Sequence, residues 1–226
     1  MRGGRLTLAR RTDGGSGVIS VLARCLAGLT TLAVALLGSP AARAFALPPA
    51  ATPARASGLW LIDENMAPSA RGPAVRTRKV WRVCLDHKAD RALHELDAWE
   101  DRARAAADGL RCDDPVYALT DRSLTSTMRC GGASLASRAD ITATLTRTTH
   151  FASNQEVRSE TVMDGGGHGR GRMVSTMRRT GPCPDSMKPG ARLLLHWTVN
   201  GQETLKGRMR GNIFQQLDEY GRVTAR

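Results

Sequence analysis

Four cysteines constrain what this chain can fold into more than any other feature of its sequence. They are Cys84, Cys112, Cys130 and Cys183. The segment from Cys112 to Cys130 has the pattern of a β-hairpin with its turn at 120–123, which places the two cysteines opposite each other. We therefore predict one disulfide between Cys112 and Cys130. A second, between Cys84 and Cys183, would join the beginning of the domain to its end.

The chain has a fifth cysteine, Cys25, near the N-terminus; the other four are an even number, which suits an exported protein, and the N-terminus also indicates export. Arginines precede an apolar run of 12 residues, Leu26–Leu37, and an A-x-A pattern follows at 42–44. This order is typical of a secretory signal peptide, and the run is shorter than the roughly 20 residues that span a bilayer. We interpret 1–44 as a signal peptide that is removed together with Cys25; an uncleaved anchor is the alternative.

The rest of the chain divides into three segments by composition. Residues 45–57 are rich in Pro and Ala and are typical of a tether. Residues 58–183 contain the four cysteines and are expected to form a disulfide-bonded, β-rich domain. Residues 184–226 form a C-terminal extension that we expect to pack on the same domain. Without its signal peptide the chain has 182 residues, enough for one domain with a substantial core.

The chain carries a net charge of +12 at pH 7. Such a charge can attract nucleic acid, lipid head groups or cell-wall polymers. Only four of its 33 basic residues are lysine, and the arginines are spread over the predicted strands and loops rather than gathered on one face. This pattern indicates a compositional bias toward arginine, and we do not expect the protein to bind nucleic acid.

One segment has the period of an amphipathic helix. Between 89 and 108 apolar residues recur every three or four positions, with Asp86 placed to cap the start and Gly109 the end. His94 and Glu95 are adjacent and point in different directions, so they do not predict a metal site. Acidic and basic side chains of the helix are expected to pair on a solvated face: Asp97, Glu100, Asp101, Arg102 and Arg104.

Most other segments alternate apolar and polar residues with the period of a strand. The clearest is 139–149, where Ile141, Ala143 and Leu145 share one face and threonines the other. Asn-Gly at 200–201 predicts a hairpin turn. Further strands are predicted at 58–65, 78–85, 154–163, 172–180 and 192–199, and a short helix at 212–220. The fold class is α+β and β-dominated: an antiparallel meander sheet of six to eight strands that can curl, with one amphipathic helix after the second strand and two disulfides.

Several of these features occur together in the same order in a known family. They are Gly58-Leu59-Trp60, the helix start at Cys84-Leu85-Asp86, the pair Cys112 and Cys130, Thr- and Met-rich strands at 142–148 and 173–177, and a closing R-x-G-x-C at 179–183. Over about residues 57–183 the chain resembles a periplasmic domain-of-unknown-function family of Gram-negative bacteria. The resemblance implies a periplasmic location and a disulfide-bonded β-rich fold, and it implies no catalytic residue. The 43 residues after Cys183 are a departure from the family, whose members often stop there.

The glycine-rich stretch "DGGGHGRGR" at 164–172 is the most conspicuous candidate for a binding loop. It lacks the Lys and Ser/Thr of a phosphate-binding Walker loop and lies between two predicted strands, so we interpret it as a hairpin tip. Arg170 and Arg172 give it at most affinity for an anion. A copper site is the alternative use of this hairpin, because Met and His are soft ligands, although strand methionines usually fill a core. The candidate ligands are Met163, His168, Met173 and Met177.

The sequence contains no recognisable catalytic motif. G-x-S-x-G is absent, and the four cysteines are assigned to disulfides, which leaves no cysteine nucleophile. We therefore predict no catalytic residue and no cofactor. The expected function is a non-enzymatic binding or interaction module for a small apolar or amphipathic ligand, held in a cavity lined by Trp60, Trp81 and strand methionines, or for an envelope partner protein. The alternatives are a copper-handling protein and a small hydrolase.

Overall fold

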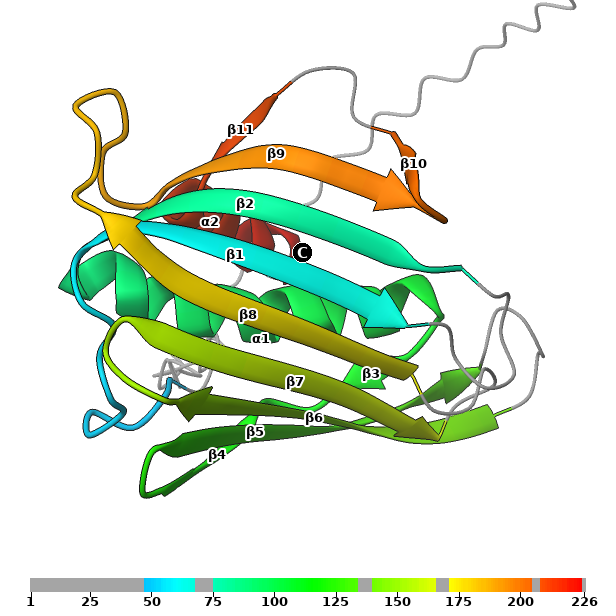
Figure 1. The fold of residues 1–226 in the computed structure, drawn as a ribbon. Helices are drawn as coiled ribbons and strands as arrows, with labels where there is room; N and C mark the ends of the chain where they lie inside the picture. The colour runs from blue at the N-terminus through cyan, green and yellow to red at the C-terminus, as the bar shows by residue number, and fades with distance from the viewer. Residues whose placement is uncertain (1–46, 68–74, 134–139, 166–170, 205–207, 225–226) are drawn as a thin grey trace, which may run out of the picture. The chain divides into compact units, whose positions relative to one another are not determined.

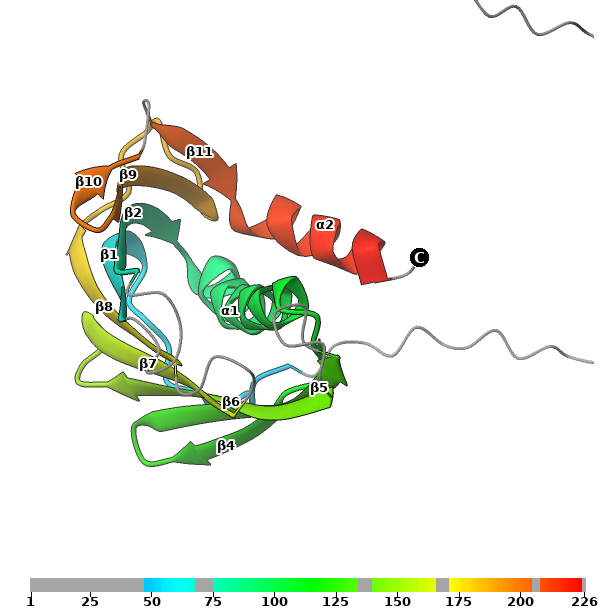
Figure 2. The same ribbon diagram turned by 90° about the vertical axis from the view of Figure 1, so that its right-hand side faces the viewer.

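A single antiparallel sheet that does not close on itself dominates the computed structural model, which describes residues 47–67, 75–133, 140–165, 171–204 and 208–224. The sheet has eleven strands and curls around the longer of two helices (Figures 1 and 2). The elements are β1 (Gly58–Ala67), β2 (Thr77–Leu85), α1 (His87–Ala107), β3 (Arg111–Cys112), β4 (Val116–Thr120), β5 (Ser123–Ala133), β6 (Asp140–Phe151), β7 (Glu156–Gly165), β8 (Gly171–Gly181), β9 (Ala191–Val199), β10 (Gln202–Glu203), β11 (Met209–Asn212) and α2 (Ile213–Thr224). The predicted α+β, β-dominated class is confirmed, and so is the helix after the second strand.

The strand order is β10-β9-β2-β1-β8-β7-β6-β5-β3, with β4 paired to β5 and β11 paired to β9. The expected meander therefore runs from β5 to β8, and the hairpin of β1 and β2 is inserted between β8 and β9. Eleven strands form where six to eight were expected. The surplus consists of β3, β10 and β11, which are two to four residues long and too short to show a period in the sequence.

Two hairpin turns form where the sequence predicts them. Thr120 pairs with Ser123 across the β4–β5 turn, and Asp121 in this turn has φ = 46°. At the β9–β10 turn both central residues have positive φ, 51° for Asn200 and 81° for Gly201. A type I′ turn requires positive φ at both positions, which Asn and Gly adopt with little strain. Turn chemistry thus determines the local register of both hairpins.

Helix α1 begins and ends at the predicted capping residues. The backbone N–H of Ala89 donates to Asp86 Oδ1 over 2.8 Å, and Gly109 follows the last turn with φ = +84°. The helix lies in the concave face of the sheet (Figure 2). Its apolar side chains pack there in a core of buried residues: Trp60, Ile62, Val83, Leu85, Ala89, Ala92, Leu93, Leu96, Leu124, Phe151, Val157, Met177 and Ile213.

The C-terminal residues complete the same sheet. Strand β9 pairs with β2, and β11 pairs with β9, so residues beyond Cys183 lie next to the start of the domain. Helix α2 follows and packs against α1, where the rings of Trp99 and Tyr220 are stacked with centroids 5.9 Å apart. Within the described residues, no helix combines the length and the apolarity that crossing a membrane requires.

Both predicted disulfides are present. Cys112 is directly opposite Cys130 in the pairing of β3 with β5, and the two form one bridge. Cys84 at the end of β2 is bonded to Cys183, 99 positions later in the chain. The first bridge staples a local hairpin, and the second holds together segments from opposite ends of the domain.

We expect the two disulfides to contribute unequally to stability. Replacing Cys84 and Cys183 by alanine should lower the free energy of unfolding by about 4–5 kcal/mol, because that bridge closes a loop of roughly 100 residues in the unfolded chain. Replacing Cys112 and Cys130 should cost about 3 kcal/mol, since their loop is much shorter. Urea denaturation of both double variants measures the difference. Equal losses, or a larger loss for the hairpin bridge, would contradict this expectation.

Candidate functional site

The acidic side chains of α1 face the sheet, and the prediction of a solvated acidic face is wrong. Asp97 and Asp101 are only 7% and 0% exposed. Arg147 of β6 donates two hydrogen bonds of 2.8 Å to Asp101 and lies 3.4 Å from Asp97. The carboxylates are buried because the sheet curls around α1, and Arg147 supplies the charge that compensates them. Of the two helix arginines that were expected as partners, Arg104 pairs with Asp101, and Arg102 pairs with Asp114 instead.

The sequence contains one signal for this buried ion pair. Arg147 follows Ile141, Ala143 and Leu145 at the same period of two, so the alternation of β6 places an arginine on the buried face. An arginine at a core position requires a buried carboxylate partner. Helix α1, which covers that face, supplies two, Asp97 and Asp101.

The two carboxyl groups beside Arg147 differ in their protonation equilibria. Burial acts to raise the pKa of Asp101, but Arg147 and Arg104 outweigh it and hold the pKa below its ordinary value. Burial also raises the pKa of Asp97, and there the more distant Arg147 does not reverse the effect. Asp101 is therefore the firm anion of the cluster, and Asp97 is the carboxyl group that can accept a further hydrogen-bond donor.

Two more arginines reach α1 from distant parts of the chain. Arg55, in the segment expected to be a tether, is buried; it lies 2.6 Å from Asp90 and contacts His94. Burial and Arg55 lower the pKa of His94 well below its usual value, so its ring is neutral at pH 7. Arg192 of β9 donates to Glu100 of α1 over 2.8 Å and to Gln216 of α2 over 2.9 Å.

Polar side chains form two adjacent rows across the concave face, which we call the inner polar belt. The first row crosses β2, β1, β8, β7 and β6 as Lys79, Glu64, Ser175, Ser159 and Thr149. The second row crosses β7, β6, β5 and β4 as Thr161, Arg147, Ser126 and Tyr117. Because residues that are directly opposite on neighbouring strands share a face, all of these side chains point toward α1.

Apolar side chains border the belt on both sides. On one side lies the row Trp81, Ile62, Met177, Val157 and Phe151, which belongs to or packs against the first core cluster. On the other side lies a second cluster around the hairpin disulfide: Ala105, Leu110, Cys112, Met128, Cys130, Ala143 and Leu145. The interior is therefore amphipathic, with a polar middle between two apolar ends.

Several polar atoms of this interior have no hydrogen-bond partner. Within the described part of the chain, eight buried side-chain nitrogen and oxygen atoms have no hydrogen-bond partner. Five of the eight lie on the belt or face it: Asp97 Oδ2, Tyr117 Oη, Thr161 Oγ1, Ser175 Oγ and Trp197 Nε1, the last from the residue opposite Lys79. The other three belong to Arg55 and Arg192. Buried polar groups are nearly always paired. The belt thus offers unsatisfied donors and acceptors to whatever occupies it.

Two carboxyl groups near the β1 end of the belt, Glu64 of β1 and Glu100 of α1, have opposite pKa shifts. Burial raises the pKa of Glu64, and the nearby Glu100 adds to this effect. Burial would also raise the pKa of Glu100, but the ion pair with Arg192 lowers it instead. Glu64 accepts a hydrogen bond from Trp81 Nε1 over 3.3 Å. The geometry thus separates one readily protonated carboxyl group from one firmly ionised neighbour.

The structure disperses the residues that the sequence proposed for a ligand cavity. Trp60 is completely buried in the first core cluster, and its Nε1 donates to the carbonyl of Ala56, so α1 occupies the space where a ligand against Trp60 was expected. Trp81 is half-buried, and its ring lies 4.3 Å from the guanidinium of Arg192. The part of the concave face that remains chemically unsatisfied is the polar belt.

The proposed copper ligands are not gathered at one point either. Met177 is a core residue with 3% exposure. Met163 packs against the second core cluster, and Met173 lies opposite Thr161. His168 lies outside the described residues, together with most of the glycine-rich stretch, so copper binding stays a prediction. The strands on either side of that stretch, β7 and β8, pair with each other.

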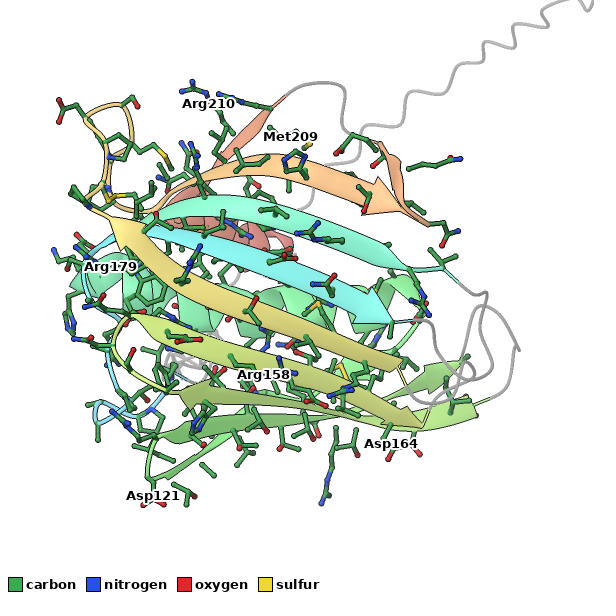
Figure 3. All side chains as sticks on the ribbon, in the orientation of Figure 1. Asp121, Arg158, Asp164, Arg179, Met209 and Arg210 are labelled. Atoms are coloured by element: carbon green, nitrogen blue, oxygen red, sulfur yellow. A yellow bond between two sulfur atoms is a disulfide. The ribbon has the colours of Figure 1, made fainter. Side chains whose placement is uncertain are left out.

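Outside the belt, the described residues contain one serine–histidine contact and one large hollow. Ser123 Oγ and His150 Nδ1 lie 3.1 Å apart on the exposed outer face. A hollow of about 1060 Å³ on that face is lined by His150, Arg158, Glu160 and four threonines of β6, Thr142, Thr144, Thr146 and Thr148 (Figure 3 labels Arg158). Its side chains reach water, so unlike the belt it leaves no buried polar group unpaired. Among the described residues, no three His, Cys, Asp or Glu side chains converge to hold a metal ion.

Comparisons with known proteins add no relative to this picture. No family model matches the chain, and no similar protein is found among curated proteins or solved structures.

The pair of Arg147 with the α1 carboxylates is expected to be essential for folding stability. Arg147→Met should lower the free energy of unfolding by about 3–5 kcal/mol, because it leaves buried Asp97 without its arginine and buried Asp101 with Arg104 alone. Neutralising both partners in the same chain, as R147M/D97N/D101N, should recover a large part of that loss. Chemical denaturation of the two variants measures this.

Arg102→Ala is the matched control, since Arg102 and Asp114 form an ion pair that is 30% and 41% exposed. Such a pair is worth at most about 1 kcal/mol. A loss for Arg147→Met as small as that of the control would show that the α1 carboxylates are hydrated.

Glu64 should make the stability of the protein depend on pH. Because its pKa is raised on folding, the native state binds this proton more tightly than the unfolded chain, whose glutamate titrates near pH 4.3. Its contribution to stability is complete below that pH and is lost as the pH rises above it. Glu64→Gln should therefore unfold at a higher temperature than the wild type at pH 7 and at the same temperature at pH 4.

Thermal unfolding across this pH range measures the effect. Glu156→Gln, which changes an exposed carboxyl group of β7, is the control. Its unfolding temperature relative to the wild type should be the same at pH 4 and at pH 7. A Glu64→Gln variant that is less stable than the wild type at pH 7 would contradict the raised pKa of Glu64.

Proposed function

We propose that the protein is a periplasmic binding module that holds one small, uncharged amphipathic ligand between α1 and the inner polar belt, without chemically changing it. The observation that carries this proposal is the group of unpartnered buried polar atoms on the belt. Leaving such an atom unpaired destabilises a protein by about 1–3 kcal/mol. Ligand sites have this composition, with a few convergent polar groups between apolar walls.

The charges at the belt favour an uncharged ligand. Four cations, Lys79, Arg104, Arg147 and Arg192, lie near the four carboxyl groups of Glu64, Glu100, Asp97 and Asp101. The two sets are equal in number. The unpartnered hydroxyl groups of Tyr117, Thr161 and Ser175 can each donate or accept a hydrogen bond. Hydroxyl, ester or amide groups of a ligand would fit them better than a carboxylate or an ammonium group.

The burial of the belt indicates how a ligand would enter. Thr161 and Ser175, on β7 and β8, are 7% and 2% exposed, whereas Glu64, Lys79 and Trp197 at the other end are half-buried. The belt is therefore more exposed at β1, β2 and β9 than at β7 and β8. Helix α2 lies on the side of β9 and β11 (Figure 2). Entry from this side would place the polar part of the ligand against the buried hydroxyl groups.

The location is supported by chemistry independent of the belt. Both disulfides close segments of the domain, and such bonds persist in oxidising compartments outside the cytosol. The order of residues in 1–44 is that of a secretory signal peptide. A protein that carries an amphipathic molecule across an aqueous compartment would need to shield it from water.

Fluorescence titration with the uncharged probe N-phenyl-1-naphthylamine, displaced by octyl glucoside, tests the proposal. The wild type should bind the probe with enhanced fluorescence. Tyr117→Phe, Thr161→Val and Ser175→Ala should each weaken displacement by octyl glucoside about fivefold, the effect of losing one hydrogen bond. Without ligand the same variants should unfold at a higher temperature, because each removes an unpaired buried polar atom.

Thr146→Val is the matched control, because Thr146 lies on the outer face of β6, directly opposite Val162, and lines the outer hollow. It should change neither displacement nor stability in this way. Failure of the wild type to bind the probe, or equal effects of Thr146→Val and Thr161→Val, would refute the proposal. Cleavage of an ester amphiphile that depends on Ser123 would instead favour the hydrolase alternative.

A further inference from the structure

The outer face of the sheet carries a second feature, which the proposed ligand site does not use. Cross-strand pairing aligns Arg178 of β8, Leu61 of β1, Arg82 of β2, Leu193 of β9 and Arg210 of β11. We call these five residues the Arg–Leu row. Arginine and leucine alternate along it over five neighbouring strands, a width of about 19 Å at roughly 4.8 Å per strand.

The β2–β9–β11 part of the Arg–Leu row is hollowed. The hollow has a volume of about 360 Å³ and is lined by four arginines, of which Arg82, Arg208 and Arg210 are exposed and Arg192 is buried. Figure 3 shows Arg210 projecting from β11. The other residues that line it are apolar or small, and none is acidic: Leu59, Pro184, Ser186, Met187, Ala191, Leu193 and Gly211. At the other end of the row, Arg178 lies opposite Glu156, so the excess positive charge is at the hollow.

The wall of the hollow is fixed in place. Residues 184–187 follow directly after Cys183, which is bonded to Cys84 of β2. The backbone N–H of Gly190 donates to the carbonyl of Cys84 over 2.8 Å, so both ends of the turn are attached to the end of β2. Leu59, Met187 and Leu193 thereby stay beside the arginines as half-exposed apolar contacts.

The three exposed arginines of the hollow differ from others on the same face. Arg78 is paired with Asp63, and Arg172 with Glu160. Arg82, Arg208 and Arg210 are exposed, and within the described residues their guanidinium groups have no ion pair and no side-chain hydrogen bond. Their charge is therefore available to a partner outside the chain.

We propose that this hollow and the Arg–Leu row form a docking surface for an anionic lipid bilayer, with the arginines bound to phosphate head groups. Guanidinium groups bind phosphate oxygens in pairs of parallel hydrogen bonds. The intervening leucines and Met187 supply the apolar contact that a membrane-surface protein adds to charge attraction. The alternation over five strands fits a surface of repeated head groups. This inference does not depend on the proposed interior ligand.

Co-sedimentation with lipid vesicles tests the docking surface. The full chain is mixed with vesicles of phosphatidylcholine alone or with about 30% phosphatidylglycerol, an anionic lipid. The wild type should bind the anionic vesicles much more tightly. R82S/R210S should weaken this binding by about 25-fold, since each basic residue near an anionic surface contributes about fivefold. Because all variants share the same N-terminal segment, any membrane affinity of that segment cancels in the comparison.

R111S/R122S is the matched control, since it removes the same charge from two exposed arginines at the β3 and β4–β5 edge of the sheet. It should bind the anionic vesicles as tightly as the wild type, and both double variants should keep the wild-type unfolding temperature. Equal losses in the two double variants would show that only net charge matters, and would overturn the proposal. If inorganic phosphate competes fully with the vesicles and its own binding is lost in R82S/R210S, that result would overturn the lipid proposal and show a site for free phosphate.

Discussion

The structure depends on the burial of acidic side chains of α1 against arginines from distant parts of the chain. Arg147 reaches the helix from the middle of the sheet, Arg55 from the segment before β1, and Arg192 from β9. Each of these pairs is costly to desolvate and becomes destabilising if one partner is lost. Together they attach one helix to three regions of the fold, so the curled sheet, the N-terminal segment and the C-terminal strands share one electrostatic anchor.

This anchor also explains why the interior is not a simple apolar core. Pairing Arg147 with Asp97 and Asp101 places charge in the middle of the concave face, and small hydroxyl side chains such as Thr161 and Ser175 surround it. The arrangement satisfies Asp101 but leaves Asp97 Oδ2 and several hydroxyl groups without a hydrogen bond. Stability alone does not account for these unpaired atoms, which is why a role in binding is the function that we propose.

The two proposed surfaces lie on opposite faces of one sheet. The inner polar belt faces α1, and the Arg–Leu row faces outward from β8, β1, β2, β9 and β11. Both use β8, β1 and β2, and the Cys84–Cys183 bridge ties the end of β2 to the segment after β8. A protein that docks on anionic lipid through one face and holds an amphipathic molecule behind the other would be suited to exchanging that molecule with a membrane.

Local chemistry in the sequence was enough to predict much of this fold. The Asp86 cap and Gly109 delimit α1, Asn200-Gly201 forms its turn, and the alternation around Cys112 and Cys130 sets their pairing, because these features depend on neighbouring residues only. The sequence alone did not reveal that the α1 acids are buried, or that Trp60 packs in the core instead of lining a cavity. These properties depend on which elements pack together. Because the sheet curls around α1, Asp101 is buried and pairs with Arg147. The pairing of separate strands aligns the residues of the polar belt. Such contacts join residues far apart in the chain, and only the tertiary structure brings them together.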